Sequence, residues 1–162
     1  MTLKSSFPPA AAPDARLLIL GSLPGERSLA AGRYYAHPQN QFWRLLSPVV
    51  GRDLHALDYA DRLGALRERG VALWDVVATA RRKGSGDAQI LDATANNLAA
   101  LVRSLSRLRA VAFNGGAAAK IGRPLLAGER VTLVDLPSSS PLHTVGLAAK
   151  QPYWEALSQY LA

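Results

Sequence analysis

The sequence predicts a single α/β domain, a three-layer α/β/α sandwich around a central, mostly parallel four-stranded sheet. Four short apolar runs each end at a small or polar residue, which is the pattern of buried strands that open onto loops. Between these runs lie segments with apolar residues at helical spacing. Strands that alternate with helices are joined by parallel crossovers, so helices are expected on both faces of the sheet.

The expected strands, in chain order, are residues 16–20, 71–74, 110–113 and 131–134. The expected helices are one around residues 42–46 and others over residues 57–69, 93–108, 116–126 and 153–161. In a parallel sheet, ligands bind outside the carboxyl ends of the strands. Function is therefore expected in the loops that begin at Gly21, Asp75, Asn114 and Asp135.

Length and charge fit one domain with a polyanionic partner. Residues 1–14, rich in Pro and Ala, are expected to form a flexible N-terminal arm, and residues 15–162 a single domain. The net charge is +7, from 19 Lys and Arg against 12 Asp and Glu. This balance favours nucleic acid first and an anionic membrane surface second. A monomer is expected.

Residue usage argues against metal and cofactor chemistry. The chain has no cysteine, which excludes disulfides, thiolate zinc sites and iron–sulfur clusters. Its three histidines lie far apart, without a metal-ligand spacing, so no cofactor and no metal are expected. The N-terminus lacks the apolar region of a signal peptide, and no apolar run is long enough to span a bilayer. A cytoplasmic protein that does not enter membranes is expected.

The loop after the first strand begins with Gly21, Ser22, Leu23, Pro24 and Gly25. Its glycines allow the backbone to approach a ligand closely, and the proline stiffens the turn. The motifs GxxxxGK[ST] and GxGxxG of phosphate-binding loops are absent. The alternative is a plain turn between a strand and a helix.

The segment YYAHPQNQFW, residues 34–43, places aromatic rings beside hydrogen-bonding groups. A protein that grips a flat polar base needs both. Tyr35 is the better candidate for stacking on a base, whereas Phe42 and Trp43 are expected in the core. His37 fits a structural hydrogen bond as well as a catalytic role.

The segment LPSSSPLHT, residues 136–144, follows the fourth expected strand. Ser138, Ser139 and Ser140 offer hydroxyl and amide groups that can hold phosphates, and Leu142 could act as an apolar wedge where a base has left the stack. His143 is expected to touch phosphate or to pack locally. The alternative for the whole segment is a flexible linker.

Together these segments resemble the uracil-DNA glycosylase superfamily, and within it the branch that removes hypoxanthine (deoxyinosine). GSLPG stands where mismatch-specific uracil glycosylases carry GINPG, and YAHPQNQFW is similar to their FAHPxNxFW. LPSSSP is similar to the MPSSSA loop of thymine-DNA glycosylases, and GVALWDVV resembles the strand that carries the base-reading side chain. The resemblance covers residues 16 to 144 in the same order.

The resemblance also implies which residues act. Leu23 replaces the asparagine that orients water in the mismatch-specific enzymes, so the resemblance to the hypoxanthine branch assigns water positioning to Asn40. Leu136 stands where other members place His or Asn before Pro-Ser, which argues against efficient uracil removal. Asp75 is expected either to accept the N1–H of hypoxanthine or to cap a following helix.

The expected function is that of a monofunctional DNA glycosylase in base-excision repair. The backbone of residues 21–25 and the Tyr35 ring would hold the flipped base, and Arg81, Arg82 and Lys83 either add charge toward DNA or form a solvated face. Asn114 is interpreted as structural. The alternatives are removal of uracil or xanthine, or a DNA-binding domain whose catalytic site has decayed.

Overall fold

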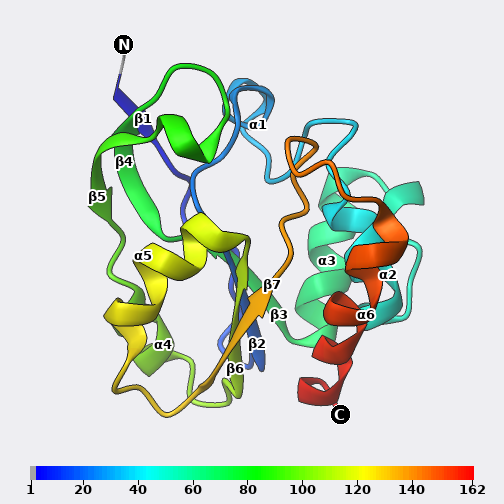
Figure 1. Ribbon diagram of the computed structural model, residues 1–162. Coiled ribbons are helices and arrows are strands. Elements are labelled where there is room, and N and C mark those ends of the chain that lie inside the picture. The colour runs from blue at the N-terminus through cyan, green and yellow to red at the C-terminus, as the bar shows by residue number, and fades with distance from the viewer. Residues whose placement is uncertain (1–2) are drawn as a thin grey trace.

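The centre of the fold is a four-stranded sheet with the strand order β3-β2-β6-β7. The computed structural model describes residues 3–162 (Figure 1). The strands are β2 (Leu17–Gly21), β3 (Val71–Asp75), β6 (Ala110–Asn114) and β7 (Thr132–Leu136). Each neighbouring pair is parallel. The strands fall on the four apolar runs, so the predicted α/β architecture with a central four-stranded sheet is confirmed.

Helices cover both faces of this sheet (Figure 1). One face carries α2 (Phe42–Val50), α3 (Tyr59–Arg69) and α6 (Leu147–Glu155), and the other carries α4 (Leu98–Ser104) and α5 (Gly116–Leu126). Within residues 3–162, no helix is long and apolar enough to cross a membrane.

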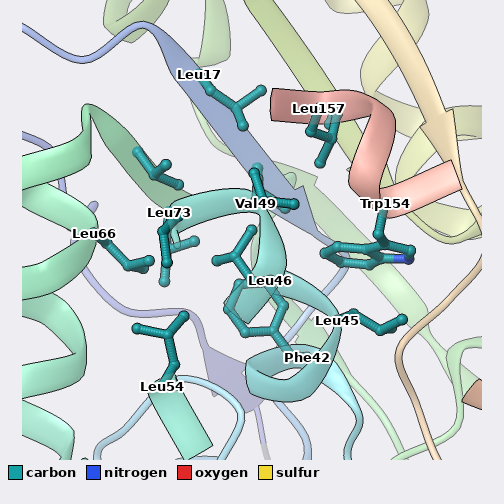
Figure 2. Close-up of a cluster of buried hydrophobic side chains, with 14 of the residues drawn as sticks. Leu17, Phe42, Leu45, Leu46, Val49, Leu54, Leu66, Leu73, Trp154 and Leu157 are labelled. Carbon is teal, nitrogen blue, oxygen red and sulfur yellow. The ribbon is translucent and has the colours of Figure 1, made fainter. Parts of the chain in front are cut away.

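Two hydrophobic clusters hold the layers together. Alternate residues of β2 point to opposite faces, so Leu17 and Ile19 belong to one cluster and Leu18 and Leu20 to the other. Figure 2 shows the first cluster, in which apolar side chains of α2 lie between those of β3 and α6. All four β2 leucine and isoleucine side chains are fully buried, and each contributes about 1.5–3 kcal/mol.

Local sequence signals fix the helix ends. Asp58 begins α3 by accepting a hydrogen bond from the Asp61 amide at 3.0 Å, and Gly70 ends it with φ 84°. The expected helix 93–108 is shorter than predicted, since α4 begins only after Asn97, which accepts from the Ala100 amide at 3.1 Å. The preceding residues form a strand instead.

That strand belongs to a second sheet that the sequence did not predict. It is antiparallel, with the order β1-β4-β5, and contains β1 (Leu3–Ser5), β4 (Val77–Arg81) and β5 (Leu91–Ala95). The side-chain amide of Asn96 donates to the carbonyls of Asp75 and Val77 at 2.8 and 3.3 Å, which ties this sheet to the end of β3.

The remaining elements are short. They are the helix α1 (Glu26–Ala31) and the 3-10 turns η1 (Leu54–Ala56), η2 (Asp87–Gln89) and η3 (Ala156–Tyr160). In Figure 1, α1, the β4–β5 connection and the orange segment after β7 gather at the same end of the central sheet.

The expectation of a flexible N-terminal arm does not match residues 3–14, while residues 1 and 2 lie outside the described chain. Besides forming β1, this segment supplies the Phe7 carbonyl to the Trp74 indole N–H at 2.9 Å and the Pro8 carbonyl to the Tyr34 hydroxyl at 2.9 Å. Ala10 also pairs with Leu73. Buried aromatic donors need acceptors, and this backbone provides them.

Candidate active site

A pocket of about 750 Å³ lies at the carboxyl ends of the central strands. The ends of β2, β3 and β6, the segments after β2 and β7, and the β4–β5 connection contribute to its lining. Arg81, Arg82 and Lys83 do not line the pocket. The pocket does bring together the other residues that the sequence singled out for catalysis, base binding or DNA binding, namely Gly21, Ser22, Leu23, Pro24, Gly25, Tyr35, Asn40, Asp75, Ser138, Ser139, Ser140, Leu142 and His143.

The loop of residues 21–25 has each of its carbonyl groups occupied by a donor from the protein. The carbonyls of residues 21 and 22 accept from the amides of Val76 and Val77 at 2.8 and 3.0 Å, and that of residue 25 accepts from Leu29 at 2.9 Å. Those of residues 23 and 24 accept from the guanidinium of Arg82. In a trans peptide the N–H points opposite to the C=O, so the amides of this loop are turned away from these partners.

Tyr35 is held in an unusual conformation by its neighbours. Its ring stacks on Phe42 with the centroids 3.8 Å apart and the planes 7° from parallel. Its hydroxyl accepts from the Asn114 side-chain amide at 3.4 Å. Its φ of 52° lies in the left-handed region, which costs a non-glycine residue roughly 1–3 kcal/mol. Phe42 thus covers one ring face of Tyr35.

Asn114 ties the end of β6 to the segment after β7. Its side-chain oxygen accepts from the Ser139 amide at 2.9 Å, and its nitrogen donates to the Ser139 hydroxyl at 2.9 Å. Ser139 is only 1% exposed, and its carbonyl accepts from Gln41. The hydroxyl of Ser139 therefore points into the protein, and the expected phosphate contact through it needs revision. The sequence could not show this because the partner lies 25 residues away.

The rest of the segment 138–143 is ordered by its own hydrogen bonds and is not a flexible linker. The hydroxyls of Ser138 and Ser140 accept from the amides two residues further along, both at 3.1 Å. The buried Lys150 donates to the His143 carbonyl at 3.1 Å. Leu142 is 65% exposed at the rim of the pocket.

Asn40 begins the turn into α2. Its side-chain oxygen accepts from the Phe42 amide at 3.0 Å, while its nitrogen has no hydrogen-bond partner within residues 3–162. His37 accepts from the Gln39 amide through Nδ1 at 3.1 Å, so the neutral ring carries its proton on Nε2. Both side chains line the pocket, and each accepts one hydrogen bond from a backbone amide.

Asp75 lies at the end of β3, with only 3% of its surface exposed. Among the described residues, its Oδ2 atom has no hydrogen-bond partner. Burial, and then the negative charge of Asp87, raises the pKa of Asp75 to about 7, against the lowering effect of Arg82. The expected alternative role as a helix cap is wrong, since strand β4 follows and no helix does.

The β4–β5 connection was not predicted to contribute, yet it supplies a wall of the pocket through residues 85–88. Asp87 accepts from the Ser22 hydroxyl, and the Ser85 hydroxyl accepts from the Glu26 amide at 2.8 Å. Arg82, expected either to add charge toward DNA or to be solvated, is 1% exposed and faces the protein interior. The run of basic residues obscured this, because most such runs lie on the surface.

The fold is that of an α/β protein whose pocket, lined by polar and aromatic residues, lies at the carboxyl ends of its parallel strands. Residues 8–161 match the family model described as the uracil DNA glycosylase superfamily. The chain belongs to this superfamily.

Relatives and a solved structure agree with this membership. The chain is 36% identical over 151 residues to the hypoxanthine DNA glycosylase of Methanosarcina barkeri, covering 93% of this chain and 95% of the relative. It is 34% identical over 158 residues to the hypoxanthine DNA glycosylase of Methanosarcina acetivorans, covering 98% and 99%. A solution NMR structure from Methanosarcina acetivorans, named provisionally as a uracil DNA glycosylase, has a TM-score of 0.89 at 34% identity and covers 99% of both chains.

Proposed function

We propose that the protein is a monofunctional DNA glycosylase that extrudes a deaminated base, hypoxanthine, from DNA and hydrolyses its N-glycosidic bond. The product is an abasic site, as in base-excision repair. The observation that carries the proposal is the convergence of Tyr35, Asn40 and Asp75 on one pocket at the strand ends. The name shared by the two relatives supports hypoxanthine as the base.

The base would lie between Tyr35 and the loop of residues 21–25. Since Phe42 covers one face of the Tyr35 ring, the extruded base would stack on the other face. Such stacking contributes roughly 1–3 kcal/mol per base. The backbone amides of Ser22, Leu23 and Gly25 would donate to the base, where they would also stabilise the negative charge that the base gains on leaving.

Asp75 would read the edge of the base. Hypoxanthine presents an N1–H donor beside the O6 acceptor, and the unpaired Oδ2 of Asp75 is an acceptor that lacks a partner within residues 3–162. An ionised carboxylate beside a departing anionic base would oppose its departure. A pKa of about 7 allows Asp75 to be neutral in much of the population near neutral pH, which reduces this opposition.

Asn40 would position the attacking water. Its side-chain oxygen has a second lone pair besides the one used by Phe42, and its nitrogen can donate. As the bond between C1′ and the base breaks, its electron pair leaves with the base, and the sugar develops oxocarbenium character. The water then adds to C1′ and loses a proton to solvent. Leu23 and Leu136 are buried at 6% and 4% exposure and offer no polar group for this task.

The segment 138–143 and the basic charge would hold the DNA. The Ser138 amide and the partly exposed hydroxyls of Ser138 and Ser140, together with His143, would contact phosphates beside the flipped nucleotide. Leu142 would fill the space that the base leaves. The net charge of +7 favours binding to DNA regardless of its base sequence. The enzyme would act as a monomer.

The experiment is a base-release assay on duplexes that each contain one inosine, uracil or xanthine, followed by alkaline cleavage of abasic sites. We expect release from the inosine duplex, and Asn40→Ala should abolish it while DNA binding persists. The matched control is Gln39→Ala, an exposed neighbour that should keep full activity. Release of uracil or xanthine in preference to hypoxanthine would reassign the substrate, and binding without release of any base would indicate a DNA-binding domain.

A further inference from the structure

On the basis of the glycosylase function proposed above, we propose that Arg82 is a positioning residue for base release. It acts from the β4–β5 connection through the carbonyls of Leu23 and Pro24, which belong to the loop that would receive the base.

The guanidinium of Arg82 is buried and serves three backbone carbonyls. Its Nε donates to Gly84 at 2.8 Å, and its terminal nitrogens donate to Leu23 at 3.3 Å and to Pro24. The whole residue is 1% exposed. Burying a guanidinium costs free energy unless its donors are satisfied, so this arrangement is unusual for a residue that serves packing alone. The planar fork of arginine suits several acceptors at once.

The Leu23 and Pro24 carbonyls have no strand partner, because they lie past the end of β2. The peptide between Leu23 and Pro24 has no N–H, so its carbonyl is its single hydrogen-bonding group. The carbonyl of Pro24 shares a peptide plane with the amide of Gly25. Arg82 therefore sets the direction in which the Gly25 amide points, and we infer that this direction is toward the base.

Two further hydrogen bonds join the same segments. The Ser22 hydroxyl donates to Asp87, and the Glu26 amide donates to the Ser85 hydroxyl at 2.8 Å. The β4–β5 connection thus supports the loop of residues 21–25 along its length, with Arg82 at the centre. Its positive charge also lowers the pKa of Asp75 against the effect of burial.

The neighbours of Arg82 in the basic run differ from it in environment. Arg81 is half-exposed and lies 3.8 Å from the Asp92 carboxylate, and Lys83 is exposed. Lys83→Met is therefore a matched control, since it removes an adjacent basic side chain that does not hold the pocket.

The test measures single-turnover base release from an inosine duplex, together with the dissociation constant for the same duplex. A misplaced group in an active site commonly costs on the order of 100-fold in rate, so we expect Arg82→Met to slow release by about this factor while DNA affinity changes little. Lys83→Met should leave the single-turnover rate unchanged and reduce affinity slightly, more at low salt. In an Arg82→Ala variant, added guanidinium ion should restore part of the rate.

A pH profile separates positioning from a general loss of structure. Arg82→Met removes the charge that lowers the pKa of Asp75, so the limb of the rate profile that reports Asp75 should move to higher pH. Arg82→Lys keeps the positive charge but lacks the planar guanidinium. Its base release should be slower than that of the native protein, while the limb of the pH–rate profile that reports Asp75 should not shift. This variant decides the matter if Arg82→Met does not fold.

Two failures are distinguishable. If the native protein releases no base from any duplex, the proposed function fails and the role of Arg82 fails with it. If the native protein is active but the variants Arg82→Met and Arg82→Lys behave like Lys83→Met, with normal rates and weakened DNA binding, Arg82 is a phosphate contact and the positioning role is overturned.

Discussion

The carboxyl group of Asp75 lies against the α-carbon of Gly21. The two residues are register partners at the ends of the adjacent strands β2 and β3. A Cβ atom built on Gly21 would stand 2.6 Å from Asp75 Oδ1 and 3.2 Å from the Tyr35 hydroxyl. The missing side chain at position 21 is therefore what leaves room for Asp75 at the floor of the pocket.

Replacing Gly21 with alanine should displace Asp75 and reduce base release on the order of 100-fold, as expected when a group in the site is shifted by about an ångström. Single-turnover kinetics on an inosine duplex measure this effect. The control is Gly64→Ala in α3, where an added Cβ meets nothing within 4 Å. That variant should keep full activity and gain roughly 0.5–1 kcal/mol of stability, because glycine is unfavourable within a helix. An unchanged rate in Gly21→Ala would contradict the placement of Asp75 in the base site.

The raised pKa of Asp75 should make the stability of the fold depend on pH. In the unfolded chain this carboxyl titrates near its ordinary value of 3.8, whereas in the folded protein its pKa is about 7. The folded state thus retains a proton that the unfolded state has lost, so the contribution of Asp75 to stability is complete below about pH 4 and is lost as the pH rises through 7.

Denaturant unfolding of the native protein and Asp75→Asn at pH 4 and pH 8 tests this sign. The free energy of unfolding of Asp75→Asn minus that of the native protein should be larger at pH 8 than at pH 4. The increase should be on the order of 3–4 kcal/mol. The charged groups that act on Asp75 are Asp87 and Arg82. Asp87→Asn removes a negative charge that raises the pKa of Asp75, so the loss of stability should occur at lower pH. Asp92→Asn, at a side chain that is 76% exposed, should leave the pH dependence unchanged. A difference that grows in the opposite direction would mean that Asp75 is ionised in the folded protein.

The central sheet could be predicted from the sequence because its strands are buried on both faces and appear as continuous apolar runs. The second sheet could not. Its strands read VATAR and LDATA, at residues 77–81 and 91–95, and contain small residues without a clear alternation. They form because β4 pairs with β5 on one side and with β1 on the other, and the paired residues of β1 and β4 are more than 70 positions apart in the sequence. Pairing over such distances leaves no local pattern.

The site was predictable to the extent that strand ends meet at one edge of a parallel sheet. Asp75 and Tyr35 could be located by this rule and by the motif around them. Arg82 could not, because its acceptors in the loop of residues 21–25 lie 58 and 59 residues away and arginine is rarely buried. The inward orientation of the Ser139 hydroxyl likewise depends on Asn114, a contact that only the fold creates.

Tyr35 should contribute to substrate binding through its ring more than through its hydroxyl. Tyr35→Ala should weaken binding of an inosine duplex by roughly 5- to 150-fold, equivalent to 1–3 kcal/mol of lost stacking. Tyr35→Phe keeps the ring and its stack on Phe42 and loses the weak 3.4 Å contact with Asn114, so its affinity should be nearly that of the native protein. Fluorescence titration with the labelled duplex measures both. If Tyr35→Phe is as weak as Tyr35→Ala, the hydroxyl and not the ring is the important group.

Leu142 should matter for duplex DNA and not for single strands. The side chain is 65% exposed, so Leu142→Ala creates no cavity and should leave the thermal unfolding temperature unchanged. A wedge is needed only where a base must be parted from its partner and its stack, so release from an inosine duplex should fall about tenfold or more, since unstacking costs a few kcal/mol. Release from a single-stranded inosine oligonucleotide should remain near the native rate. Leu125→Ala, at a leucine of α5 that is 44% exposed and lies outside the pocket lining, should alter neither rate. Equal losses on both substrates would instead place Leu142 in the base pocket itself.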